Sequence, residues 1–216
     1  DTLRHGSVGI GYVGLWPGVG ELGGGLQKAF YRRTLATPLR PRETTRANPW
    51  LYYGTLAVEA GKDLTFYAGY TRGLEDTVVA PENAVNAGEA PPASLTKQVD
   101  AGLRYRLSPT MSLVAGVFEV TKPYFDRNAA AVYGQVGMLS HRGIEFSLSG
   151  DPLEGLKIVT GAVLLKARVS GLTVAQGLIA KIPPGRHPVV VRLNATYGPA
   201  AWHGFSLNGQ VKFEDS

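Results

Sequence analysis

The chain of 216 residues contains no cysteine. This absence excludes a disulfide-stapled scaffold, a cysteine zinc site and a thiol nucleophile. Charged residues are scarce, at 18% of the chain, against about a quarter in an average soluble domain. No apolar run approaches the ~20 residues that a membrane-spanning helix needs, and the net charge of +5 includes no run of like charges. Neither a transmembrane helix nor a nucleic-acid-binding arm is therefore predicted.

Motifs for catalysis are equally scarce. Gly18–Gly23 fits the glycine pattern of a dinucleotide site, but two more glycines and a strand-like run follow it instead of a helix, so a hairpin turn is the better interpretation. No serine lies in a nucleophile elbow. Glu75 and Asp76 fall in a connection, where solvated acids are expected. The histidines have no metal-ligand spacing, so no metal site, cofactor or enzyme activity is predicted; they are His5, His141, His187 and His203.

Alternation of apolar and polar residues is the dominant pattern. In 98–107, for example, Val99, Leu103 and Tyr105 share one face while the charged residues share the other. Because successive side chains of a strand point to opposite faces, each such segment predicts a strand with one apolar and one polar face. Ten strands are predicted, at 7–16, 23–34, 52–60, 63–74, 98–107, 111–122, 143–150, 155–168, 189–197 and 205–213.

The connections between these strands alternate in length. Short turns rich in Gly, Pro and Asp centre near residues 19, 61, 109, 152 and 201, so they recur every 42 to 49 residues. Long connections lie between them, at 35–49, 75–96, 123–135 and 169–187. A uniform set of tight turns at one end and long loops at the other is typical of transmembrane β-barrels. A β-propeller also repeats at ~40–45 residues, but it needs four short strands per repeat where this chain offers two long ones.

The polar faces of the predicted strands carry charged and amide side chains. In a barrel these side chains would point into the lumen, and Glu145 would pair there with a basic residue or with whatever fills the lumen. In any other antiparallel sheet they would be solvated. The predicted lumen-facing residues are Asp100, Arg104, Arg106, Glu145, Arg192 and Asn194. The excess of glycine, 28 residues, is only partly explained by turns and by strand positions such as Gly69, Gly102 and Gly116.

Several segments, in order, resemble strands of TonB-dependent receptors. The run Leu64–Glu75 (LTFYAGYTRGLE) is similar to the family's "L-x-L-Y-A-x-Y-S-x-G", and Thr96–Tyr105 (TKQVDAGLRY) to "K-Q-x-E-x-G-L-K-Y", with Asp100 where Glu is commoner. Leu113–Lys122 resembles the strand that follows, and His141–Gly150 (HRGIEFSLSG) is similar to "S-R-G-x-E-x-x-x-x-G". The resemblance continues through 155–167 and through Ile182-Pro183 with His187. It covers about residues 50–215 and is strongest for the ferric-siderophore branch.

The resemblance implies an all-β fold, an antiparallel up-and-down transmembrane barrel. The family barrel has 22 strands and a plugged lumen, which ten strands cannot close. Residues 1–216 are therefore expected to form a single partial barrel domain, with the plug domain and the C-terminal barrel strands absent. A complete ten-stranded barrel, porin-like or structural, is the alternative, and it would pair 7–16 with 204–213. A soluble β-propeller is a third possibility.

The function implied by the resemblance is active import of a metal chelate, most often a ferric siderophore, across a bacterial outer membrane. The implied partners are the chelate, outer-membrane lipid and, through the absent plug, the TonB complex. Aromatic rings and arginine suit anionic ferric siderophores through stacking and charge-assisted hydrogen bonds. The contact residues expected on the long loops are Tyr124, Phe125, Arg127 and Tyr133, although each of them could instead simply pack the loop.

Overall fold

A computed structural model of the chain describes residues 1–37, 40–183 and 188–215. Its framework is a single antiparallel sheet whose strands follow one another as a meander. A four-residue helix, α1 (Leu172–Ala175), and a 3-10 turn, η1 (Ala200–Trp202), interrupt the connections. Within the described residues, no helix has the length and apolar character needed to cross a membrane. The strands are β1 (Thr2–Trp16), β2 (Gly20–Thr37), β3 (Arg40–Ala47), β4 (Trp50–Glu59), β5 (Leu64–Glu75), β6 (Ser94–Ser108), β7 (Met111–Arg127), β8 (Tyr133–Leu153), β9 (Leu156–Ser170), β10 (Val189–Tyr197) and β11 (Leu207–Glu214).

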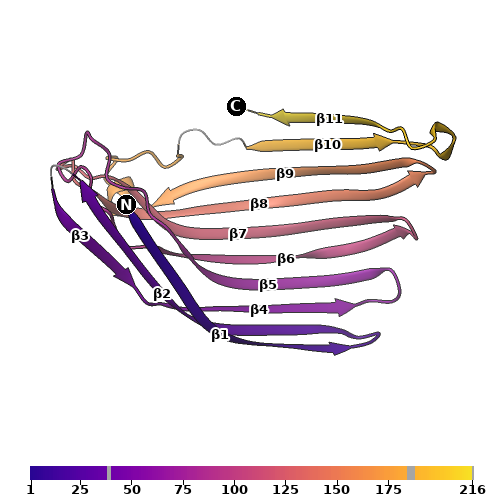
Figure 1. The fold of residues 1–216 in the computed structure, drawn as a ribbon, viewed down its shortest axis with the longest axis horizontal. Helices are drawn as coiled ribbons and strands as arrows, with labels where there is room; N and C mark the ends of the chain where they lie inside the picture. The colour runs from indigo at the N-terminus through magenta and orange to yellow at the C-terminus, as the bar shows by residue number, and fades with distance from the viewer. Residues whose placement is uncertain (38–39, 184–187, 216) are drawn as a thin grey trace.

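The order across the sheet is β1-β2-β4-β5-β6-β7-β8-β9-β10-β11, and β3 pairs with the far half of β2. β4 pairs with residues 20–28 of β2 and β3 with residues 31–37, so β3 and β4 together cover one edge of that strand. In Figure 1 the short turns lie at the right of the sheet, and β3, α1 and the longer connections gather at the left. The predicted placement of the short turns and of the other set of connections at opposite ends of one sheet is confirmed, although some of the predicted long connections are partly strand.

All ten predicted strands are present, with bounds that differ by several residues in places. The eleventh, β3, lies in a segment that was predicted to be a long connection, 35–49. Its sequence, RPRETTRA, consists mostly of charged residues and Thr and has no apolar face, and strand prediction from alternation depends on such a face. β3 forms because β2 extends beyond the predicted 23–34 and offers it a free edge to pair with.

The two alternative folds are contradicted by this topology. β1 and β11 stand at opposite ends of the strand order and do not pair with each other in the described part of the chain. A closed ten-stranded ring is therefore wrong. The strands form one continuous sheet rather than four-stranded blades, so the propeller is wrong as well.

One predicted long connection, 123–135, is mostly strand. β7 runs on to Arg127 and β8 begins at Tyr133, which leaves only 128–132 as the turn. This hairpin is longer than predicted because strand pairing continues past Pro123. Tyr124 pairs with Gly137 and Phe125 with Gln135, with an irregularity in the register between the two pairs. The connection 169–187 is in part strand and helix, and His187 lies outside the described residues.

The sheet has an exposed apolar face. Pairing aligns Ala101 of β6 with Val117, Ile144 and Leu164 of the next three strands. The last three are large, and 54%, 56% and 51% of their surfaces are exposed. A water-soluble sheet buries such a face against a second layer, whereas this one is left uncovered along its length, as the outer wall of a membrane barrel is.

Buried apolar residues gather instead at the end with the long connections. Leu139, Ala167 and Val169 form a small cluster against which Tyr124 and Val174, the latter from α1, are packed. Ala80, Ala84 and Ala90 of the β5–β6 connection are also buried. The conventional core of this fold therefore lies where the strand ends of β8 and β9 meet the folded connections, and not in the middle of the sheet.

Candidate ligand-binding site

The six residues predicted to face a lumen share one face of the sheet. Pairing runs from Arg104 through Val114, Ser147 and Gly161 to Arg192 across five strands, β6 to β10. Glu145, Asp100, Arg106 and Asn194 lie an even number of residues from members of this row, so they belong to the same face. This face is opposite the one that carries Val117, Ile144 and Leu164. That it lines a lumen stays a prediction.

A tyrosine lies flat across the middle of this polar face. Tyr67 on β5 pairs with Gly102, Gly102 pairs with Gly116, and Gly116 pairs with Glu145. The Tyr67 hydroxyl donates a hydrogen bond to Oε1 of Glu145 over 3.5 Å. A Cβ atom added at Gly116 would lie 2.6 Å from that hydroxyl oxygen, so the ring occupies the space that two missing side chains leave. This arrangement explains the two strand glycines, and it makes Tyr67 a wall residue that sequence reasoning missed.

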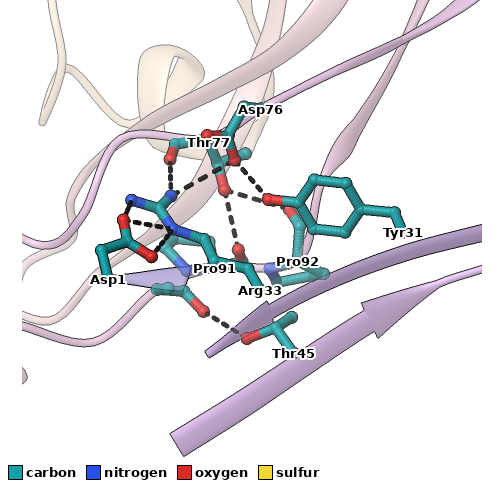
Figure 2. A network of polar contacts seen from close by, with 9 residues as sticks. Asp1, Tyr31, Arg33, Thr45, Asp76, Thr77, Pro91 and Pro92 are labelled. Carbon is teal, nitrogen blue, oxygen red and sulfur yellow. Dashed lines mark hydrogen bonds and ion pairs between the residues drawn. The ribbon is translucent and has the colours of Figure 1, made fainter. Parts of the chain in front are cut away.

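The β5–β6 connection, residues 76–93, is fastened to the same side of the sheet. Figure 2 shows the fastening, in which the guanidinium of Arg33 on β2 reaches both Asp1 and Asp76. The closest N–O distances are 2.8 Å to Asp1 and 3.2 Å to Asp76, and Arg33 also donates to the carbonyl oxygen of Thr77 at 2.7 Å. Only 9% of Arg33 is exposed. Tyr31 donates to the same Asp76 carboxylate at 2.5 Å.

This network corrects the expectation that Glu75 and Asp76 are simply solvated. Asp76 accepts from Arg33 and Tyr31, and Glu75 forms an ion pair with Lys122 at 2.6 Å. Each acid is still about half exposed, at 47% and 44% of its side chain. The partners lie 43 to 47 residues away in the sequence, so patterns among neighbouring residues do not predict these contacts.

The tip of the same connection contacts the β7–β8 hairpin. The side-chain amide of Asn86 donates to the carbonyl oxygen of Tyr133 and accepts from its amide, at 2.9 and 2.8 Å. Arg127 donates to the carbonyl oxygen of Asn83 at 3.4 Å. The rings of Tyr133 and Phe125 are tilted against each other at 6.3 Å, and burial raises the pKa of Tyr133. Tyr133 and Phe125 thus take part in packing this hairpin against the connection.

Tyr124 and Arg127 line a cleft of about 410 Å³ between the hairpin and the segment after α1. Asp126 completes the polar part of its wall, and Leu178 and Ile182 form the apolar part. Two of the four predicted contact residues therefore meet in one hollow. All four were predicted on a long loop, and that placement is wrong: three are on β7 and Tyr133 begins β8, because the hairpin is longer than predicted.

The chemistry of this cleft is that of noncovalent binding. It combines an aromatic ring, a guanidinium, a carboxylate and two aliphatic side chains, a set that suits an amphipathic ligand with an anionic or hydroxylated edge. Across the described residues, no group of three or more His, Asp or Glu is placed to hold a metal ion.

Comparison with known proteins places this geometry among outer-membrane receptors. No protein-family model matches the chain. An alignment 127 residues long, which covers 55% of the chain, shows 29% identity to the ferrichrome receptor FcuA of Yersinia enterocolitica. The crystal structure of BauA, the ferric preacinetobactin receptor from Acinetobacter baumannii, superimposes on 98% of the chain with a TM-score of 0.71 and 23% identity. The copper transporter OprC does so over 98% of the chain, with a TM-score of 0.71 and 16% identity.

The chain spans only part of these proteins. It covers 16% of FcuA, 32% of the BauA chain and 34% of the OprC chain. Its fold is that of a barrel segment of TonB-dependent receptors, as the sequence resemblance implied. Receptors of this family reside in the outer membrane and act as transporters, not as enzymes.

Proposed function

We propose that this chain is part of the barrel wall of a TonB-dependent outer-membrane receptor that imports a metal chelate, with ferric siderophores as the cargo class. The observation that carries the proposal is the two-faced open sheet, with an exposed apolar face, a polar face on the other side, and folded connections at one end only. The ferrichrome and preacinetobactin receptors support siderophores as cargo. OprC, a copper transporter with the same fold, makes copper the second candidate.

The remaining parts of such a receptor follow as part of the proposal. The described sheet has two unpaired edges, β1 and β11, and an exposed edge in a bilayer leaves backbone groups without hydrogen-bond partners. Residues 1–216 are thus proposed to form one partial barrel domain that further strands complete. A plug within the lumen would face Asp100, Arg104, Arg106, Glu145, Arg192 and Asn194, and it would couple the receptor to the TonB complex.

Within the folded end, the cleft between the hairpin and the segment after α1 is the proposed contact site for the chelate. Arg127 offers donors for an anionic oxygen and Tyr124 offers a ring edge or face. Phe125 and Tyr133 support the hairpin that positions them.

The test is uptake and binding by the protein that carries this chain. Iron-starved cells expressing it are given a panel of ⁵⁵Fe-labelled siderophores, and in parallel ⁶⁴Cu, with and without a functional TonB. Saturable ⁵⁵Fe uptake that requires TonB is expected. Copper uptake without iron uptake would move the cargo to the second candidate, and iron uptake that persists without TonB would refute the mechanism.

The contact residues are tested separately on the purified receptor. Arg127→Gln is expected to weaken binding of the transported chelate by about tenfold or more, since a charge-assisted hydrogen bond is worth about 1.5–3 kcal/mol. Arg32→Gln is the matched control, because Arg32 is an exposed arginine on β2 that does not line the cleft. Equal affinity of the Arg127 variant and the control would remove the cleft from the proposed binding site.

A further inference from the structure

A second tyrosine lies across glycines on the polar face of the sheet. Tyr53 of β4 pairs with Thr71 of β5, and Thr71 lies an even number of residues from Tyr67, so the two tyrosines share this face. The row of Tyr53 continues away from β5, through Gly25 of β2 to Gly11 of β1. β4 and β5 are neighbours (Figure 1), so the rows of the two tyrosines leave a central pair of strands in opposite directions.

The ring of Tyr53 covers its two glycines as the ring of Tyr67 does. A Cβ atom added at Gly25 would lie 2.4 Å from Cε1 of Tyr53 and 3.1 Å from its hydroxyl oxygen, and one added at Gly11 would lie 3.0 Å from the same oxygen. The corresponding distance from Gly116 to the hydroxyl oxygen of Tyr67 is 2.6 Å. In both rows the hydroxyl has therefore crossed the first glycine strand and reaches the second.

The two rows differ at the third strand. The Tyr67 hydroxyl meets Glu145 of β8 there, and a Cβ atom added at Gly116 would lie 3.1 Å from Oε1 of that acid, so the glycine also makes room for the carboxylate. The row of Tyr53 stops at Gly11, because β1 is an edge of the described sheet. Within residues 1–37, 40–183 and 188–215 the Tyr53 hydroxyl forms no hydrogen bond, and 44% of this residue is exposed.

We propose that the strand flanking the β1 edge in the intact receptor carries a glutamate or a glutamine directly opposite Gly11, and that this side chain accepts a hydrogen bond from the Tyr53 hydroxyl. The partner of the β1 edge is thus a strand of the same receptor with a stated residue type at a stated position. The inference rests on the proposed function, in which further strands complete the barrel, and it is independent of the cargo.

The residue type follows from the reach and the chemistry of the contact. A tyrosine O–H donates, so the partner must present an acceptor oxygen, which excludes lysine and arginine. The acceptor must also reach back across β1, and neighbouring strands lie about 4.7–4.9 Å apart. Glu145 covers the equivalent distance with a side chain of this length. The space is present, because a hollow of about 360 Å³ adjoins the row and is lined by Gly9, Gly11, Gly25 and Tyr53, among others.

A second copy of the chain that paired through its own β1 would not supply this acceptor. β1 reads TLRHGSVGIGYVGLW and contains neither glutamate nor glutamine. A dimer across this edge would therefore leave the Tyr53 hydroxyl without the partner that Tyr67 has. This difference favours a strand of other sequence at the β1 edge.

The position is tested by disulfide cross-linking in the intact receptor. Val13→Cys is combined with single cysteines introduced along the strand that flanks β1, and this chain contributes no cysteine of its own. Val13 lies on the same face as Gly11, and 54% of it is exposed. Paired residues of antiparallel strands have Cα atoms about 4.5–5.5 Å apart, within the range that a disulfide spans, so one position should cross-link best.

The native residue opposite Gly11 lies two positions after that cross-linking site, because the strands run antiparallel. We expect it to be glutamate or glutamine, and any other residue there would overturn the proposal. A cross-linked product of doubled mass would show that a second copy occupies the edge, and this result would overturn it as well.

The hydrogen bond is tested by a double-mutant cycle on the urea midpoint of unfolding in micelles. Tyr53→Phe removes only the hydroxyl, and substitution of the acceptor by alanine removes the other partner. Tyr53→Phe should shift the unfolding equilibrium about fivefold or more when the acceptor is present and much less when it is absent. Tyr12→Phe is the matched control, since Tyr12 lies on the opposite face of β1 and is 69% exposed. The same shift from Tyr53→Phe in both backgrounds, or an equal coupling of the control, would contradict the proposed contact.

Two further readouts separate the possible causes of a failure. The heat-modifiable mobility of the receptor in detergent gels shows whether each variant has formed its barrel. Uptake of the ⁵⁵Fe-labelled chelate by cells that express the unaltered receptor tests the proposed function. Absent coupling with TonB-dependent uptake intact concerns the β1 edge alone, whereas coupling without such uptake concerns the proposed function.

Discussion

Replacing Arg33 with alanine should release the β5–β6 connection from the sheet without unfolding the strands. Arg33 joins β2 to this connection through its ion pair with Asp76 and its hydrogen bond to the Thr77 carbonyl, and its ion pair with Asp1 ties the start of β1 to the same point. The substitution leaves the Asp1 carboxylate and the buried Thr77 carbonyl oxygen without their Arg33 donor, while Asp76 keeps its hydrogen bonds from Tyr31 and from the Thr77 amide. The strands keep their ladders, because no backbone bond of the sheet depends on this side chain.

The magnitude follows from the exposure of the partners. Removing one member of a buried ion pair costs about 3–5 kcal/mol, while an exposed pair contributes about 0–1 kcal/mol. Arg33 is buried, but the side chains of Asp1 and Asp76 are 46% and 47% exposed and can be rehydrated. An intermediate cost of about 2 kcal/mol is therefore expected, which corresponds to roughly a 30-fold shift toward the undocked connection.

Hydrogen exchange of the Val85 amide measures this shift. That amide donates to the carbonyl oxygen of Ala131 across the interface between the connection and the β7–β8 hairpin, at 2.9 Å, so it exchanges when the connection undocks. Exchange should become about 30-fold faster in Arg33→Ala. Arg32→Ala is the matched control, since Arg32 directly precedes Arg33 on β2 and is exposed on the other face of the sheet. Unchanged exchange in Arg33→Ala, or an equal acceleration in Arg32→Ala, would refute the reasoning.

Two other substitutions test the polar face of the sheet and the pH dependence of the Arg33 network. Gly116→Val should lower the urea midpoint of unfolding of the receptor in micelles by an amount equivalent to about 1–3 kcal/mol, because the new side chain occupies the space of the Tyr67 ring. Gly54→Val is the control, since an added Cβ there meets nothing within 4 Å, and it should leave the midpoint nearly unchanged; the same midpoint in both variants would show that Tyr67 has room to move. Tyr31 lies on the part of β2 that projects beyond the apolar face, and burial together with its hydrogen bond to Asp76 raises its pKa from 10.0 to about 12. Its contribution to stability should be complete below pH 10 and should be lost as the pH rises toward 12; a difference titration at 295 nm between the unaltered receptor and Tyr31→Phe measures this pKa, and a midpoint near 10 would contradict it.

The strands of this fold could be predicted from alternation because successive residues of a barrel strand face an apolar and a polar environment in turn. Val99, Leu103 and Tyr105 had to be apolar for the same reason that Asp100 and Arg104 could be charged. β3 escaped prediction because both of its faces are polar, so no alternation marks it. Its existence depends on the length of its partner strand, which is a property of the fold and not of the segment.

The candidate site was less accessible to prediction because its contacts join residues far apart in the chain. Tyr124 and Arg127 were selected for their chemistry, but their position on β7 depends on the ladder with β8, and the cleft they share needs Leu178 and Ile182. Arg33 carried no local signal at all, since its partners are 32 and 43 residues away. Tyr67 had a signal in retrospect, in the glycines of the two following strands.

The row from Tyr67 through Gly102 and Gly116 to Glu145 also bears on how the strands find their partners. A slip of two residues between neighbouring strands keeps every apolar side chain on the apolar face, so the alternation by itself does not forbid it. Such a slip between β5 and β6 would bring Asp100 or Arg104 beneath the Tyr67 ring in place of a glycine. Because only one alignment of each pair leaves room for the ring, this row can select the correct pairing while the strands assemble.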